Sequence, residues 1–203
     1  PHDDHLRGLL PVLTRYHVRQ VLMSAAEHHS SVYRQWRQQV RDRGIPCLIV
    51  QYSLRVDFGD GSVLDVLPPE TVDPNDLDQT ALIARLGWQS MSFLFTADLK
   101  ADGLQELWAT GWPLNCTVLK VPHYGSTKAL NEDLVAEMNP NLAIISVEAG
   151  NRFGYPAQET LMVLEQAGVQ VLRTDRVGTI EVVTDGEQYW VRAGNLRWCT
   201  SSK

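Results

Sequence analysis

The strongest constraint on the fold is the alternation, along the whole chain, of short strand-like runs with segments of helical spacing. Runs rich in β-branched and aromatic residues stand at residues 18–23, 46–52, 54–58, 63–67, 80–86, 91–95, 116–121, 142–147, 169–173, 179–184 and 188–191. Helical spacing of apolar residues is found at 5–16, 31–43, 101–110, 131–138 and 157–167. Because the two kinds of element are interleaved, the sequence predicts a mixed α/β (α+β) fold.

Local signals mark several turns and helix ends. Glycine-rich stretches at residues 58–61 and 185–186 predict two β-hairpins. Ser31 and Asn131 are predicted helix caps, and Gly168 is a predicted C-terminal helix stop.

The composition is that of an ordinary globular chain. With 203 residues, 44% of them hydrophobic and 21% charged, the sequence predicts one domain over residues 1–203. The net charge of −6 argues against a broad, non-specific nucleic-acid binder. It is compatible with nucleic-acid binding through a local basic groove or through metal-mediated contacts to phosphate. Three cysteines lie far apart without a C-x-x-C pair, and Cys47 and Cys116 are expected to be buried thiols because their surroundings are apolar.

The first five residues, Pro1-His2-Asp3-Asp4-His5, place two imidazoles and two carboxylates directly before a helix-like segment. Imidazole suits zinc, iron or manganese, and carboxylates add negative charge, so the run is a candidate metal-ligand cluster. The alternative is a solvated terminus whose acidic residues favour the start of a helix. The run by itself leaves both interpretations open.

A carboxylate and an imidazole follow two of the apolar strand-like runs. Asp98 comes after residues 91–95 and is either a bridging metal ligand or a cap for the helix that begins near Lys100. His123 comes after residues 116–121 and is either a metal ligand or a polar surface residue. The order along the chain, a His-Asp-Asp-His run followed by an Asp and a His at strand ends, favours a metal site.

In these motifs the chain resembles the metallo-β-lactamase superfamily, and most closely the hydrolase domain of ComEC-type DNA-uptake (competence) proteins. The superfamily's His-x-His-x-Asp-His resembles His2-Asp3-Asp4-His5, with its leading His expected just before Pro1. The family's Gly-Asp resembles Ala97-Asp98, and its Leu-Lys-Val-x-His-His-Gly-Ser resembles residues 119–126. Further ordered similarities at residues 143–147, 151–156 and 173–178 extend the resemblance over nearly the whole chain.

The resemblance implies a four-layer αββα sandwich, whose opening strands this chain lacks, with two divalent metal ions, zinc or manganese, at one sheet edge. By position, His2 would bind the first ion, and Asp98 would bridge both. The second ion would be held by Asp4, His5 and His123. The first ion's ligand set would be short of two histidines. His17, His28 and His29 fall in the interval where many family members place one of them, but none follows a strand end at the expected place, which favours a surface or capping role. We therefore expect weak metal binding and low activity for this chain alone.

The resemblance also implies a metal-dependent hydrolase, a phosphodiesterase or nuclease that uses a metal-bound hydroxide on a phosphate ester, with DNA as one candidate substrate. Two cations lower the pKa of a shared water and neutralise charge on the attacked phosphate. Asp4 and Asp98 would orient the nucleophile, and Tyr124, Ser126 or Tyr155 would donate to the leaving oxygen. The chain departs from the family at Tyr124, where a second His is usual, and at Tyr155, which replaces the His of a Gly-His-Pro turn.

The alternative function is a non-catalytic metallo-β-lactamase-like module that serves binding or structure. Some competence-type relatives are fused to membrane segments and others are single-domain proteins. We therefore expect a cytoplasmic location for a stand-alone protein and an extracytoplasmic one for part of a membrane DNA-uptake protein. The sequence does not define the oligomeric state.

Three further features have two interpretations each. Four arginines in residues 31–43 form either a nucleic-acid contact or a solvated face: Arg34, Arg37, Arg41 and Arg43. The six tryptophans are scattered, which favours packing over a stacking platform. Asn151 and Arg152 shape either the rim of a site or a plain turn.

Overall fold

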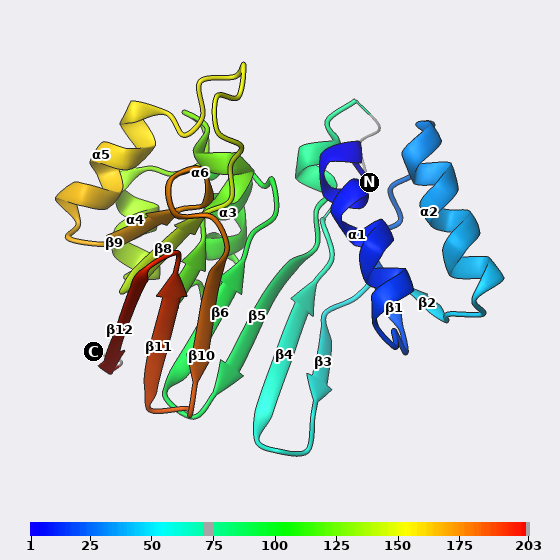
Figure 1. The fold of residues 1–203 in the computed structure, drawn as a ribbon, viewed down its shortest axis with the longest axis horizontal. Coiled ribbons are helices and arrows are strands. Elements are labelled where there is room, and N and C mark those ends of the chain that lie inside the picture. Colours follow the sequence, from blue (N-terminus) through cyan, green and yellow to red (C-terminus); the bar gives the residue numbers. More distant parts are fainter. Residues whose placement is uncertain (71–74, 202–203) are drawn as a thin grey trace. The chain divides into compact units, whose positions relative to one another are not determined.

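The computed structural model describes residues 1–70 and 75–201 (Figure 1). It contains helices together with parallel and antiparallel sheets, which confirms the predicted mixed α/β class. Two compact units are present, one formed by Pro1–Leu54 and Leu67–Leu82, the other by Arg55–Val66 and Ile83–Lys203. The four-layer arrangement and the single domain stay predictions.

The first unit is built on two helices, α1 (Asp3–Arg15) and α2 (Ser31–Asp42). They pack through a buried cluster of Leu6, Leu13, Val32, Tyr33, Trp36 and Val40. The unit also contains a parallel pair of strands, β1 (Val21–Met23) and β2 (Cys47–Ile49), and the 3-10 helix η1 (Leu77–Thr80). Ser30, and not the predicted Ser31, caps α2, because its hydroxyl accepts a 3.0 Å bond from the Tyr33 amide.

Cys47 is exposed, so the prediction of a buried thiol there is wrong, whereas Cys116 is buried as predicted. All three residues of β2 are exposed, because this short strand belongs to a sheet of only two strands. An apolar run therefore marks the strand correctly without indicating burial.

The second unit contains a seven-stranded sheet in the order β3-β4-β5-β6-β7-β8-β9. Its strands are β3 (Leu54–Asp57), β4 (Ser62–Leu67), β5 (Ile83–Trp88), β6 (Met91–Phe95), β7 (Val118–Lys120), β8 (Leu142–Ile145) and β9 (Gln170–Arg173). Strands β6 to β9 are parallel, and β5 is antiparallel to β6. The crossovers between the parallel strands contain α3 (Ala101–Ala109), α4 (Glu132–Met138) and α5 (Gln158–Gln166).

A smaller antiparallel sheet of β10 (Ile180–Thr184), β11 (Gln188–Ala193) and β12 (Leu196–Ser201) packs on one face of the large sheet (Figure 1). Its β11 residues Tyr189, Val191 and Ala193 join Met91, Val118, Leu142 and Leu172 in one buried cluster. Because side chains alternate along a strand, the registered row Leu94, Leu119 and Ala143 lies on the opposite face, where it is also buried. The parallel part of the sheet is therefore covered on both faces, as expected for parallel strands.

Both predicted hairpins are present, since residues 58–61 join the neighbouring strands β3 and β4, and residues 185–186 lie between β10 and β11. The sequence missed β12 and the single-turn helix α6 (Thr174–Val177). Among the described residues, no helix is both long and apolar enough to cross a membrane.

Candidate functional site

The loops that follow the parallel strands of the second unit carry most of the predicted site residues. Asp98 follows β6, His123 and Tyr124 follow β7, and Tyr155 lies in the loop after β8. Because the carboxyl ends of parallel strands share one edge of a sheet, this edge is the usual place for a ligand or active site in such folds.

Backbone hydrogen bonds fasten these loops to one another. The His123 amide donates to the Ala97 carbonyl over 3.0 Å, which joins the loop after β7 to the loop after β6. The Ala157 amide donates to the Gly125 carbonyl over 2.8 Å, which joins the loop after β8 to the loop after β7. The positions of Asp98, His123 and Tyr155 are thus set by main-chain contacts.

Three non-glycine residues at this edge have left-handed backbone conformations. Their φ values are 46° at Ala97, 45° at His123 and 54° at Tyr124. Each such conformation costs about 1–3 kcal/mol, and such residues cluster at functional sites, where the surrounding structure holds them. The three therefore mark the ends of β6 and β7 as the candidate site.

Asp98 is only 6% exposed and has a half-buried lysine, Lys120, as an electrostatic neighbour. Burial lowers the pKa of the Lys120 ammonium, and the nearby Asp98 carboxylate opposes that decrease. The ammonium also donates to the Val121 carbonyl over 2.9 Å. The N-cap residue of α3 is Lys100, so Asp98 is not the capping residue that the alternative interpretation required.

His123 is half-buried, and its ring centroid lies 6.1 Å from that of Tyr124 and 5.9 Å from that of Tyr155. Its Nδ1 atom is buried and has no hydrogen-bond partner among the described residues. Buried polar atoms are almost always paired, so an unpaired imidazole nitrogen in a strained loop is suited to an external ligand. Asp98 and His123 are of the side-chain types that bind divalent cations, and they follow the neighbouring strands β6 and β7.

Four side chains beside His123 form a continuous stack, which we call the aromatic ladder: Tyr124, Tyr155, Phe153 and Arg152. The Tyr124 and Tyr155 rings are 6.3 Å apart with planes at 16°, and the Tyr155 and Phe153 rings are 5.7 Å apart at 18°. The Arg152 guanidinium carbon lies 5.0 Å from the Phe153 ring centroid. Sequence reasoning missed this stack, because no linear spacing relates Tyr124 to residues 152–155.

Asn151 organises the turn that presents the ladder. Its side-chain oxygen accepts from the Phe153 and Tyr155 amides over 3.2 and 3.0 Å. Its side-chain nitrogen donates to the Tyr155 and Glu148 carbonyls over 2.7 and 3.1 Å. Asn151 therefore has the turn-forming role of the plainer interpretation, whereas Arg152 belongs to the ladder.

The first unit holds the opening cluster. His2 occupies the N-cap position of α1, its Nδ1 lies 3.6 Å from the Asp78 Oδ1, and its ring packs 5.7 Å from that of His28. Asp3 and Asp4 stand in the first turn, where carboxylates favour the helix dipole. His5 is half-buried in the same turn. Both interpretations of the run are therefore compatible with this geometry.

The structure distinguishes the three histidines that the sequence left equivalent. His28 is half-buried and its Nδ1 lies 4.0 Å from the Asp3 Oδ1, whereas His17 and His29 are exposed. Asp78 was not predicted as a neighbour of His2, because more than seventy residues separate them in the sequence.

The predicted residues are thus divided between the units. His2, Asp4 and His5 belong to the first unit, and Asp98, His123, Tyr124 and Tyr155 to the second. Within the second unit the structure brings His123 together with both tyrosines and with the Ala97-Asp98 loop. Lys120 was missed as well, although a lysine at the end of an apolar strand directly before a candidate ligand was a usable signal.

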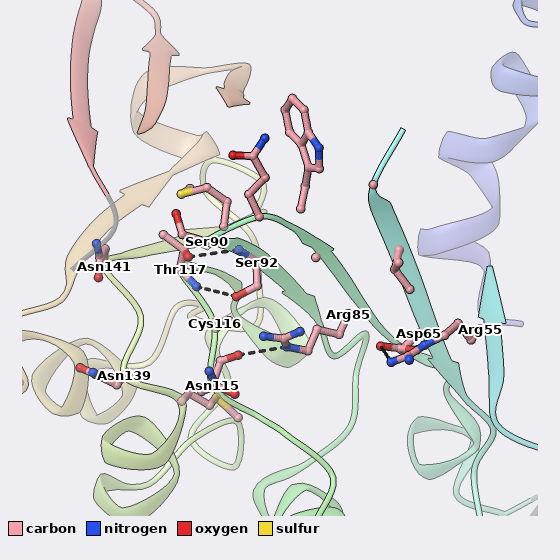
Figure 2. Close-up of a pocket in the computed structure, with 17 residues that line it drawn as sticks. Arg55, Asp65, Arg85, Ser90, Ser92, Asn115, Cys116, Thr117, Asn139 and Asn141 are labelled. Atoms are coloured by element: carbon pink, nitrogen blue, oxygen red, sulfur yellow. Dashed lines mark hydrogen bonds and ion pairs between the residues drawn. The ribbon is translucent and has the colours of Figure 1, made fainter. Parts of the chain in front are cut away.

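A polar cavity of about 570 Å³ lies at the amino ends of β6, β7 and β8, opposite to the edge that holds Asp98 and His123 (Figure 2). Figure 2 shows separate polar contacts: Arg55 binds Asp65 through two bonds of 2.6 and 3.0 Å, and Arg85 donates to the Asn115 carbonyl over 3.1 Å. The Arg55 hydrogen bond keeps the pKa of Asp65 below its usual range. Because this carboxylate is already paired, the cavity is the weaker candidate for catalysis.

The arginines of α2 mostly contact their own surroundings. Arg34 donates to the His29 carbonyl, Arg37 contacts the Met23 sulfur over 3.3 Å, and Arg41 donates to Gln38 over 2.7 Å. These local contacts favour the solvated face over a nucleic-acid contact.

One comparison with known proteins gives a relative. The chain is 36% identical over 116 residues to ComE operon protein 3 of Bacillus subtilis, a stretch that is 57% of this chain and 15% of that protein. The chain thus spans a minor part of that relative's length. No family model matches the chain. The similarity supports a competence-associated relationship, which agrees with the resemblance seen in the sequence motifs.

Proposed function

We propose that the chain is a metal-dependent hydrolase of phosphate esters, a phosphodiesterase or nuclease, in a competence-associated, DNA-uptake role. The observation that carries this proposal is the unpaired, buried Nδ1 of His123, on a left-handed loop that is hydrogen-bonded to the loop of Asp98. The competence-related name of the relative supports the DNA-uptake role.

The proposed ligands for two divalent ions, zinc or manganese, are those that the family resemblance implies: His2, Asp4, His5, Asp98 and His123. Such ions supply Lewis acidity toward a phosphate and make water a nucleophile near neutral pH.

The remaining chemistry belongs to the side chains of the second unit. Lys120 is an electrostatic neighbour of Asp98 and offsets part of its negative charge. Tyr155 and Tyr124 lie beside His123 and would donate a proton to the leaving oxygen. Ser126, whose buried Oγ has no hydrogen-bond partner among the described residues, is the third candidate donor.

A non-catalytic binding module is the second candidate function. Tyr124 and Tyr155, where the family has histidines, favour it, because a phenol transfers protons less readily near neutral pH than an imidazole does.

The test combines bound-metal analysis with cleavage of bis(p-nitrophenyl) phosphate. We expect the full-length wild-type protein to contain zinc or manganese, and Asp98→Asn in that protein to reduce turnover about 100-fold or more while keeping the circular dichroism spectrum. The matched control is Asp102→Asn, an exposed carboxylate in the first turn of α3, which leaves turnover unchanged. Negligible metal together with no Asp98-dependent turnover would contradict the hydrolase and leave the binding module.

A further inference from the structure

We propose that the aromatic ladder is a base-stacking subsite for single-stranded nucleic acid, which guides the strand toward His123. The inference deepens the proposed function, since it names the form in which a nucleic-acid substrate would be recognised.

The ladder has the geometry of a stacking surface. Its ring spacings of 5.7 and 6.3 Å and interplanar angles of 18° and 16° fall within the range of offset stacking. The Arg152 guanidinium, 5.0 Å from the Phe153 centroid, extends the stack by one more planar group. A nucleobase continues such a series because it too is a flat π system.

The outer end of the ladder is open to solvent. Phe153 is 63% exposed and Arg152, which lies beyond it in the stack, is exposed as well, so a base can reach both groups although the Phe153 ring stacks on Tyr155. The turn beneath it is held by the four hydrogen bonds of Asn151, so a base would meet a surface that is already ordered. Such preorganisation reduces the entropy lost on binding.

The chemistry of the ladder selects a single strand. In a duplex the base faces are stacked on one another, whereas an unpaired strand offers each face to an aromatic ring. Arg152 adds a cation for a phosphate next to the stacked base. The inner end of the ladder is Tyr124 and Tyr155, whose rings lie about 6 Å from that of His123, so a base on the ladder places neighbouring phosphates toward His123.

The experiment is equilibrium binding of fluorescent 12-nucleotide probes, followed by anisotropy at fixed salt with a chelator present. The probes are single-stranded oligo-dT, an abasic strand of equal length and charge, and a blunt duplex. The variants are Phe153→Leu, which removes the π face while keeping an apolar side chain, and Phe153→Trp, which keeps it. Phe58→Leu in the β3–β4 turn is the matched control, because Phe58 is similarly exposed, at 56%.

We expect Phe153→Leu to weaken oligo-dT binding about 5-fold or more, since stacking contributes roughly 1–3 kcal/mol per base. Phe153→Trp and Phe58→Leu should bind like wild type, and wild type should prefer oligo-dT to the abasic strand and the duplex. Three outcomes would overturn the proposal. Phe153→Leu could bind oligo-dT as tightly as wild type does, or it could lose affinity equally for oligo-dT and for the abasic strand. The third outcome is that wild type does not bind oligo-dT. Because the chelator removes catalysis, these outcomes do not depend on whether the chain is a hydrolase.

Discussion

Gly125→Ala tests whether close packing of the loops at the carboxyl edge of the sheet holds the candidate site together. Gly125 has φ +76°, and a Cβ added there would lie 2.8 Å from the Pro156 Cβ and 3.6 Å from the Ile145 Cδ1. Carbon atoms normally pack about 3.5–4.0 Å apart. The Pro156 Cβ is a ring atom in the loop after β8, so it cannot rotate away, and the two loops must separate.

The expected cost has two parts. A left-handed conformation costs an alanine about 1–2 kcal/mol, and overpacking costs about 1–3 kcal/mol more. The sum is a loss of about 2–5 kcal/mol in the free energy of unfolding. Gly168→Ala is the matched control, because Gly168 has φ +70° and its added Cβ would meet nothing within 4 Å, so only the conformational part of about 1–2 kcal/mol applies.

Urea unfolding, followed by tryptophan fluorescence, measures both variants. With a slope of about 2 kcal/mol per molar urea, an extra loss of about 2 kcal/mol moves the midpoint of Gly125→Ala about 1 M below that of Gly168→Ala. If the two variants unfold at the same midpoint, the close approach of Gly125 to Pro156 does not constrain the loops, and the reasoning fails.

Two further predictions concern a thiol and an ion pair. Burial raises the pKa of the Cys116 thiol to about 12. Iodoacetamide at pH 8 should therefore modify the exposed Cys47 and Cys199 in the native chain, and Cys116 only after unfolding. Intact-mass spectrometry counts the adducts, and three adducts that form together in the native chain would contradict this. The Arg173 guanidinium donates two hydrogen bonds of 3.0 and 2.6 Å to Asp175 and holds the pKa of that carboxylate below its usual value. The pair therefore stabilises the fold above about pH 4, and this contribution is lost as the pH falls through the lowered pKa. Asp175→Asn should therefore lower the free energy of unfolding at pH 7 by about 1–3 kcal/mol and have a smaller effect near pH 2, and an equal loss at both pH values would show that ionisation of Asp175 is not the cause.

Local chemistry explains which elements the sequence predicted well. Strand β6 was predicted with its observed bounds, residues 91–95, because a run of bulky apolar residues, broken only by Ser92, ends there before the polar Thr96. Asn131 caps α4 as predicted, since its side chain accepts from the Leu134 amide over 2.9 Å, and Gly168 has the positive φ expected of a helix stop. These sequence signals depend only on residues that are neighbours along the chain.

The missed elements depend on distant parts of the chain. Strand β12 exists by pairing with β11, and α6 is a single turn after β9, too short for a periodic signal. At the candidate site, Asp98 and His123 could be predicted because both follow apolar strands. The ladder could not, because Tyr124 meets Tyr155 only after the chain has passed through α4 and β8.

The main-chain bonds from His123 to Ala97 and from Ala157 to Gly125 have a consequence for how this edge of the sheet changes in evolution. Since amides and carbonyls hold the loops, side chains in those loops can be exchanged without loss of the bonds that position them. The side chains of Tyr124 and Tyr155 take no part in these two bonds, so exchanges at both positions are compatible with this frame. The chemistry of the edge can therefore change by single substitutions, while the fold beneath stays the same.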